Sequence, residues 1–242
     1  MDILSQPLAS VTDARDTISS CVIAIDGPAG AGKSTVARRL ALRLGFQYVD
    51  SGATYRAAAL KLLESGMPLD DEVSALEVTA HAMISLGTSA EDPKVWLDGR
   101  DVTSEIRTPQ VSLTAARISR LPTVRQRLVQ LQRQAALGRR VVMEGRDIGT
   151  VVFPDAPLKI FLTADALERA RRRLGDDRQH GSDSTLERTA GEIQTRDRLD
   201  ANRQASPLIP APDAIHIDST CLNVEEVVEK IAEIARDRGI CD

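Results

Sequence analysis

The sequence is poor in aromatic residues, in cysteine and in long apolar stretches. Only 2% of its 242 residues are aromatic, so aliphatic side chains have to fill the core. The three cysteines, Cys21, Cys221 and Cys241, have neither metal-site nor disulfide-framework spacing, and we expect reduced thiols in the cytoplasm. No apolar run approaches the roughly 20 residues of a membrane helix. Residues 1–20 are too polar for a secretory signal, and we expect a flexible N-terminal extension there.

A surplus of basic residues is also absent. Lys and Arg number 31 against 35 Asp and Glu, which gives a formal net charge of −4. A general nucleic-acid binder needs a basic surplus to displace counterions, so the balance argues against that class. The basic residues that are present are mostly arginines, and they cluster along the chain. Because the planar guanidinium pairs with phosphate and carboxylate oxygens, these clusters favour phosphate-bearing ligands.

Short apolar, β-branched runs alternate with helical patterns along most of the chain. The runs that predict strands are 21–25, 46–49, 141–143, 158–162 and 214–217. Helices are expected at 34–44, 53–64, 72–86, from about 109, and at 122–137, 166–174, 185–201 and 224–236. This alternation predicts an α/β fold, in which helices cover both faces of a central parallel sheet. The polar residues 175–184 are expected to form a mobile loop.

One region interrupts the alternation. Asp98-Gly99 stands between two runs that contain apolar residues and predicts a hairpin over 94–102. We therefore expect an insertion with a small antiparallel part at about 66–108. Residues 21–242, with this insertion included, are expected to form a single domain whose core lies at about 21–65 and 109–242.

A nucleotide-binding motif follows the first expected strand. Residues 27–34, GPAGAGKS, match G-x-x-x-x-G-K-[ST] between a buried strand and a helix, which is the required context. Backbone N–H groups and the helix N-terminus hold phosphates there, Lys33 is expected to reach the β- and γ-phosphates, and Ser34 to bind Mg²⁺. No N-K-x-D motif is present, which disfavours a GTP switch. The expected ATP-binding residues are Gly27, Pro28, Ala29, Gly30, Ala31, Gly32, Lys33, Ser34 and Thr35.

Two polar segments leave the ends of other expected strands, where open α/β sheets bind their ligands. DSGATYR, at 50–56, contains Ser51 and Arg56, and EGRDIGT occupies 144–150. A surface helix start explains the first segment equally well. The second, with its arginine, aspartate and two glycines, suits a ligand contact better than a structural turn.

A third segment places charges along one helix face. Arg196, Asp200 and Arg203 are spaced i, i+4 and i+7 and therefore lie on the same side of a helix. A salt-bridged, solvated face is the alternative interpretation. Together with the two preceding segments, these residues indicate a second anion-binding site, for a phosphoryl acceptor.

These motifs resemble those of the bacterial-type cytidylate kinases. The resemblance rests on GPAGAGKST, YVDSGATYR, EIRTPQV, EGRDIGTVVFPDAPLKIFL and RDRLDANRQASPL, and extends from about Val22 to Arg236. It implies a three-layer P-loop NTPase fold with a small inserted NMP-binding region and a mobile lid at about 170–186. The implied reaction is phosphorylation of CMP and dCMP by ATP with Mg²⁺, in pyrimidine metabolism. A monomer without nucleic-acid or membrane partners is the default expectation. A UMP/CMP kinase or other small-molecule kinase, and a non-catalytic ATP-binding module, remain as alternatives.

The resemblance also assigns the CMP-binding residues by position. They are Asp50, Ser51, Arg56, Arg125, Arg146, Asp147, Arg196, Asp200 and Arg203. Ser51, Arg56, Arg146 and Arg203 would hold the acceptor phosphate, and Arg196 and Asp200 would contact the sugar. Arg125 and Asp147 would read the base, because cytosine offers an amino donor to a carboxylate and two acceptors to an arginine. Ala116 stands where the family is expected to place a serine against the base, which weakens the expected preference for CMP over UMP.

The catalytic residues follow from what phosphoryl transfer requires, namely alignment and positive charge. Those expected are Lys33, Arg146, Arg169 and Arg173. The last two belong to the basic helix before the lid, for which a solvated surface helix is the alternative. Glu144 is a candidate for ordering the water shell of the metal.

Overall fold

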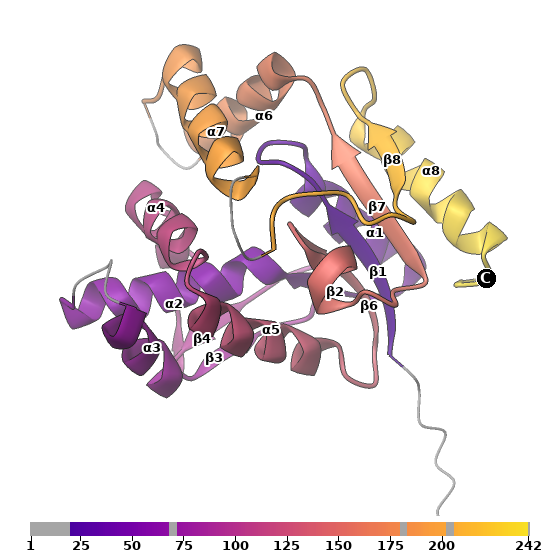
Figure 1. Cartoon of the computed structure of the whole chain (residues 1–242). Helices are drawn as coiled ribbons and strands as arrows, with labels where there is room; N and C mark the ends of the chain where they lie inside the picture. Colours follow the sequence, from indigo (N-terminus) through magenta and orange to yellow (C-terminus); the bar gives the residue numbers. More distant parts are fainter. Residues whose placement is uncertain (1–19, 68–71, 180–182, 202–205, 242) are drawn as a thin grey trace, which may run out of the picture.

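In the computed structural model, residues 20–67, 72–179, 183–201 and 206–241 are described (Figure 1). In these ranges five parallel strands form one sheet, in the order β2-β6-β1-β7-β8. The strands are β1 (Cys21–Asp26), β2 (Gln47–Asp50), β6 (Arg140–Gly145), β7 (Leu158–Thr163) and β8 (Ile215–Asp218). Parallel neighbours need crossover connections, which the helices provide.

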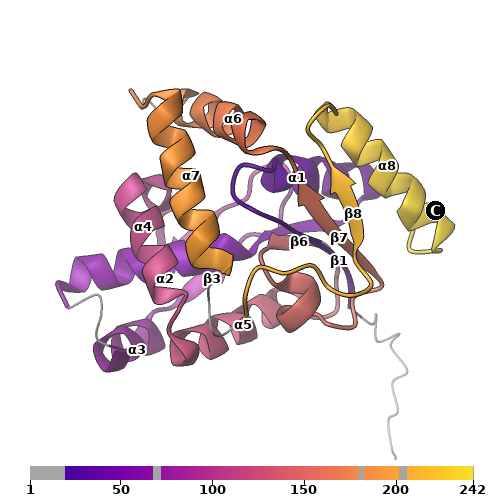
Figure 2. The ribbon, with the colours of Figure 1, turned by 45° about the horizontal axis from the view of Figure 1, so that its top comes forward.

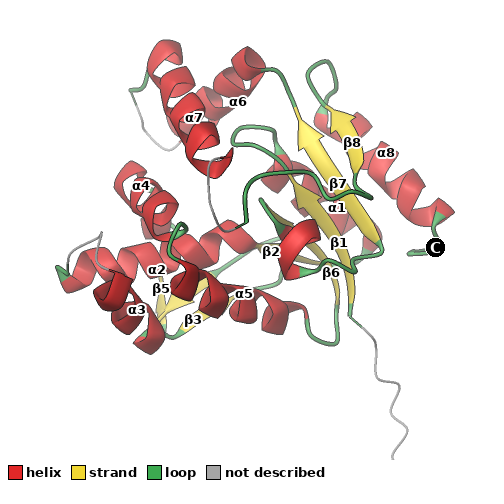
Figure 3. Cartoon of the chain, viewed as in Figure 1, coloured by secondary structure: helices red, strands yellow, loops and turns green. Residues whose placement is uncertain are grey.

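Helices pack against both faces of this sheet, and further helices pack on other helices rather than on the sheet (Figure 3). They are α1 (Lys33–Leu44), α2 (Ser51–Ser65), α3 (Glu72–His81), α4 (Pro109–Ile118), α5 (Pro122–Ala136), α6 (Ala166–Gln179), α7 (Leu186–Ala201) and α8 (Val224–Asp237). Two shorter helical turns are η1 (Glu105–Arg107) and η2 (Ile148–Val152). The predicted α/β fold with a parallel sheet between helices is confirmed.

Alternation along β1 decides which layer each of its side chains enters. Ile23 and Ile25 pack with α1 and α8 in one core cluster, whereas Val22 and Ala24 pack with α5 and η2 in another. The central position of β1 leaves all four side chains buried. Each fully buried aliphatic side chain of the size of Ile contributes roughly 1.5–3 kcal/mol to folding. The end of β1, from which the nucleotide-binding loop starts, is therefore held rigidly.

A second, smaller sheet lies between α3 and α4 in the sequence. It is antiparallel, in the order β3 (Ile84–Leu86), β4 (Val95–Leu97) and β5 (Arg100–Asp101). Asp98 and Gly99 both have positive φ, 52° and 81°, which is the turn geometry predicted for this hairpin. The helix predicted over 72–86 is wrong beyond His81, because Ile84–Leu86 pairs with β4 instead.

The region around α6 and α7 also departs from expectation. The mobile loop predicted over 175–184 is wrong for 175–179, where α6 continues to Gln179. Residues 180–182 of that loop, residues 1–19 of the predicted extension, and Arg203 lie outside the described ranges. Figures 1 and 2 show α4 and α7 side by side, and the two helices are in contact. No helix in the described ranges combines the length and hydropathy that crossing a membrane requires.

Candidate functional site

A cavity of about 1810 Å³ lies at the carboxyl ends of the parallel strands. The segments that follow β1, β2, β6 and β8 all contribute to its wall, as do α4, α6 and α7. The nucleotide-binding motif and the acceptor segments predicted from the sequence thus meet in one space. Ligands of open α/β sheets occupy this position because loops converge there and helix N-termini point at it.

The loop after β1 can follow its path only with glycine at two positions. Gly27 has φ 152°, and a Cβ atom there would lie 2.0 Å from the carbonyl oxygen of Leu162. Gly30 has φ 76°, and its Cβ atom would lie 2.7 Å from the carbonyl oxygen of Arg169. The loop is thereby pressed against β7 and α6, and residues 29–36 line the cavity.

Lys33 is the first residue of α1, and its side chain is buried. Nζ donates a hydrogen bond to the carbonyl oxygen of Pro28, at 2.8 Å. Burial and the nearby positive charge of Arg146 lower the pKa of Lys33 to about 7. A bound polyphosphate would reverse this effect, because it favours the charged ammonium group.

Ser34 and Glu144 bring two hard oxygen ligands together. The Ser34 hydroxyl donates to Oε1 of Glu144 at 2.5 Å, and the Tyr48 hydroxyl lies 3.4 Å from the same oxygen. Burial and the charge of Glu144 raise the pKa of Tyr48, so the phenol stays neutral beside the carboxylate. A hydroxyl and a carboxylate next to a phosphate-binding loop are the ligands that Mg²⁺ takes alongside nucleotide oxygens. In the described ranges no cluster of three or more His, Cys, Asp or Glu side chains suggests another metal site.

Arg125 and Asp147 form a buried ion pair on the wall of the same cavity. Arg125 comes from α5 and also donates to the carbonyl oxygen of Ser119, at 3.1 Å. Its guanidinium carbon lies 5.6 Å from the centre of the Tyr55 ring. Pairing, a backbone acceptor and an aromatic face together fix the direction of the Arg125 guanidinium. The pair is therefore preorganised before any ligand arrives.

Three arginines from different elements, Arg56, Arg146 and Arg196, line the cavity together with Lys33. Arg146 pairs with Asp200, with 2.9 Å between Nε and Oδ2, and Arg56 pairs with Asp50 at 2.5 Å. The Nε atom of Arg56 is buried and has no hydrogen-bond partner among the residues that the structure describes.

Arg196, on α7, differs from these two because no hydrogen bond or ion pair to it is found in the described ranges. Burial and the charge of Arg146 lower its pKa to about 9. The charge of Asp200 opposes this shift. Half-buried arginines gathered on one cavity wall are groups suited to binding an anion.

Polar contacts with β6 and α5 fix the first turn of α2. Asp50 caps the helix by accepting from the N–H group of Ala53, at 3.0 Å. Ser51, expected at the acceptor phosphate, lines the cavity but donates its hydroxyl to the carbonyl oxygen of Glu144, at 2.7 Å. Gln132 on α5 donates to Thr54 at 2.9 Å and to the carbonyl oxygen of Ser51 at 3.3 Å. Sequence reasoning missed Gln132, because nothing in its local pattern signals a partner some 80 positions away.

The two arginines of α6 expected to be catalytic are placed differently. Arg173 lines the cavity, as do its neighbours Arg171 and Arg172. Arg169 does not: it pairs with Asp197 at 2.5 Å and donates to the carbonyl oxygen of Ala29 at 3.0 Å. Arg173 thus lies on the cavity wall and Arg169 contacts the nucleotide loop, while a catalytic role for either arginine stays a prediction.

Comparison with known proteins adds to this geometry. A family model described as cytidylate kinase matches residues 23–237. A cytidylate kinase from Pelotomaculum thermopropionicum is 53% identical over 210 residues, which cover 86% of this chain and 93% of that protein. One from Caldanaerobacter subterraneus is 51% identical over 214 residues, covering 88% and 94%. Among solved structures, an uncharacterized protein from Eubacterium ventriosum covers 90% of this chain and 99% of its own, with TM-score 0.51 and 13% identity, a likeness of fold alone.

Proposed function

The chain belongs to the cytidylate kinase family, and we propose that it transfers the terminal phosphoryl group of ATP to CMP and dCMP, forming CDP and dCDP. The observation that carries this proposal is that one cavity contains a nucleotide loop, a cluster of arginines and the preformed Arg125–Asp147 pair. A protein that only holds ATP needs the first of these and has no use for the other two.

The donor is held by the loop that starts at Gly27. The backbone amides of the loop and the N-terminus of α1 receive the phosphates, and Lys33 turns from Pro28 toward the β- and γ-phosphates. Ser34 would hold Mg²⁺, with Glu144 ordering its water shell. When bound, the ion neutralises charge on the phosphate oxygens.

The base of the acceptor is read by Arg125 and Asp147. The amino group of cytosine donates to the Asp147 carboxylate, while its ring nitrogen and carbonyl oxygen accept from Arg125. Uracil would place a carbonyl oxygen against the carboxylate, leaving both unpaired in a buried site. The fixed direction of the Arg125 side chain supports this discrimination.

The acceptor phosphate and sugar occupy the arginine cluster. Arg56 and Arg146 bind the phosphate together with Ser51 and with Arg203, which lies outside the described ranges. Arg196 and Asp200, both on the cavity wall, contact the sugar from α7.

Transfer itself needs little from the protein beyond alignment. A phosphate oxygen of CMP forms the new bond to the γ-phosphorus while the bond to ADP breaks. Because that oxygen is already ionised near neutral pH, no general base is required. Lys33, Arg146 and Arg173 balance the charge that builds up on the transferring group.

Further proposals concern the organisation of the chain. Residues at about 170–186 would serve as a lid over ATP and those at about 66–108 as the inserted acceptor-binding region, within one domain over 21–242. We also propose that the protein is a monomer and acts in pyrimidine metabolism. A cytoplasmic location is proposed as well, and the free thiols of Cys21, Cys221 and Cys241 support that location. Sedimentation of the purified chain would test the oligomeric state.

The direct test of the function follows the label from γ-labelled ATP. The proposal expects the label to appear in CDP when CMP and Mg²⁺ are present. Label that appears only in inorganic phosphate, with or without CMP, would show an ATPase and refute the proposal. Arg146→Ala should abolish transfer to CMP while ATP still binds.

A further inference from the structure

Asp26, the last residue of β1, has a buried carboxylate that the proposed mechanism does not use. Its two oxygens accept separate backbone hydrogen bonds: Oδ1 from the N–H group of Ile148, at 2.9 Å, and Oδ2 from that of Gly149, at 2.8 Å. These amides begin η2, directly after Arg146 and Asp147. A carboxylate at the N-terminus of a helical turn is favoured by both hydrogen bonds and the local dipole.

Asp26 lies between the segment that binds the donor and the segment that binds the acceptor. Gly27, the next residue, starts the donor loop, while in the sheet Asp26 is aligned with Gly145 of β6. Because β1 is the central strand and is buried on both faces, the backbone of Asp26 is held on both sides by the sheet. The carboxylate is thus a fixed point between the loop that binds ATP and the turn that carries Arg146 and Asp147.

The turn that Asp26 holds is also tightly packed. A Cβ atom on Gly145 would lie 2.5 Å from the Ser51 hydroxyl oxygen and 2.7 Å from the side chain of Ile148. A Cβ atom on Gly149 would lie 3.1 Å from the side chain of Lys159, on β7. Packing therefore limits how near the turn can approach the sheet, and the hydrogen bonds of Asp26 limit how far it can move away.

The charge of Asp26 matters for both hydrogen bonds. Burial raises its pKa to about 6, while the N–H groups of Gly149 and Ile148 and the charge of Lys33 oppose the rise. At neutral pH the carboxylate is therefore mostly ionised and can accept from both amides. A neutral amide in its place has a single carbonyl oxygen, and its NH₂ group would face a backbone N–H donor.

We propose that Asp26 is a positioning residue for the acceptor: its carboxylate fixes the turn at 145–149 so that Asp147 meets the base and Arg146 meets the phosphate. The proposal rests on the proposed function, since it takes CMP as the acceptor. Asp26 touches neither substrate. It acts through the two residues that precede its hydrogen-bond partners.

The test compares Asp26→Asn with a matched control, Asp101→Asn. Asp101 also accepts from a backbone N–H group and from a hydroxyl, both of Thr103, but it is exposed and lies away from the cavity. Steady-state KM values for CMP and for ATP are measured separately. For Asp26→Asn we expect the KM for CMP to rise about tenfold or more and the KM for ATP to stay within about twofold.

A rise of both KM values together would show a disturbance of the whole cavity, and this outcome would overturn the proposal. A lower apparent kcat with both KM values unchanged would show only a loss of folded enzyme, and would overturn it as well. An unchanged KM for CMP would overturn it as well. In a double-mutant cycle the effects of Asp26→Asn and Asp147→Asn on CMP should be non-additive, because the first acts through the second. Full additivity would contradict the stated route.

Two further controls separate the possible failures. If Asp26→Asn does not fold, Asp26→Glu takes its place in the same assays, since it keeps the charge but displaces both oxygens by one methylene group. A normal KM for CMP in that variant would overturn the proposal. If the unaltered chain shows no CMP-dependent ADP release, the proposed function fails and the role of Asp26 fails with it.

Discussion

The guanidinium of Arg125 and the carboxylate of Asp147 form an ion pair in which the side chains are only 5% and 8% exposed. Arg125 is also held by Ser119 and stands over Tyr55, so the pair has a fixed direction before a ligand binds. A buried pair costs desolvation energy, which is recovered only if a further partner completes its hydrogen bonds. A cytosine base presents an amino donor, which suits a carboxylate, next to a ring nitrogen and a carbonyl oxygen, which suit a guanidinium.

Asp147→Asn should weaken the reaction with CMP far more than the reaction with UMP. Losing a hydrogen bond between the substrate and a charged group costs about 1.5–3 kcal/mol, so kcat/KM for CMP should fall about 10- to 100-fold. The new amide can donate to the uracil carbonyl, so the ratio of CMP to UMP activity should shrink. Asp155→Asn, at an exposed carboxylate after η2, is the matched control. An unaltered CMP/UMP ratio would remove Asp147 from base reading.

Ala116→Ser should sharpen the preference for CMP. Ala116 is buried on α4 and lines the cavity together with Ser119 and Arg125. One additional hydrogen bond contributes about 1 kcal/mol, so the CMP/UMP ratio of kcat/KM should rise about fivefold. Ala135→Ser, on α5 and outside the cavity wall, should leave the ratio as it is. If Ala116→Ser also leaves the CMP/UMP ratio unchanged, the new hydroxyl does not reach the base.

Binding of Mg²⁺–ATP should take up a proton at mildly alkaline pH. The pKa of Lys33 is about 7 in the ligand-free chain, so at about pH 8 most of this side chain is neutral. Phosphate oxygens favour the ammonium form and raise the pKa again, so uptake should approach one proton at about pH 8 and become small at about pH 6. Calorimetry in two buffers of different ionisation enthalpy measures this uptake. Lys33→Met should show no proton uptake. If the heat of Mg²⁺–ATP binding to the parent chain at about pH 8 does not depend on the buffer, Lys33 does not take up a proton.

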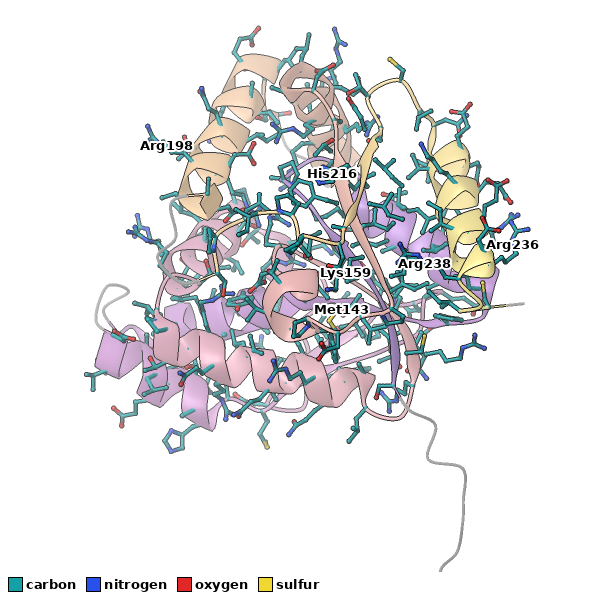
Figure 4. The ribbon with its side chains drawn as sticks, turned by 45° about the vertical axis from the view of Figure 1, so that its right-hand side comes forward. Met143, Lys159, Arg198, His216, Arg236 and Arg238 are labelled. Carbon is teal, nitrogen blue, oxygen red and sulfur yellow. The ribbon has the colours of Figure 1, made fainter. Side chains whose placement is uncertain are left out.

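Arg196→Ala should weaken acceptor binding and leave folding stability equal or improved. Burial and repulsion by Arg146 disfavour its charge in the folded chain, which the lowered pKa of about 9 reflects. The KM for CMP should rise about tenfold or more, while the melting temperature should not fall. Arg198→Ala is the control, since this exposed arginine points outward from α7 (Figure 4). A lower melting temperature with an unchanged KM would make Arg196 structural.

The sequence predicted the parts of this molecule that depend on local pattern. Apolar runs located the strands of the parallel sheet, and Asp98-Gly99 located the hairpin turn. Ile84–Leu86 was assigned to a helix because its apolar residues continue the helical spacing of α3. Only pairing with β4, which is set by the fold, makes it a strand.

The site could be predicted as far as its motifs, but its internal contacts could not. Lys33, Ser34 and Asp147 belong to segments whose composition points to phosphate and base chemistry. The contacts of Asp26 with Ile148, and of Arg169 with Asp197, join residues far apart in the sequence, and single-sequence patterns carry no signal for them. Arg169 is an example: its role in transfer stays a prediction from its basic neighbourhood, whereas its contacts with Asp197 and Ala29 are set by the fold.

The most direct test of the central claim is ADP release with Mg²⁺–ATP and, in turn, CMP, dCMP, UMP, AMP, GMP or no acceptor. We expect the rate of ADP release with CMP or dCMP to be more than about tenfold higher than with any other acceptor. Only cytosine forms hydrogen bonds with both Arg125 and Asp147. The contradicting result is ADP release that no monophosphate stimulates. The arginine cluster would then not be an acceptor site.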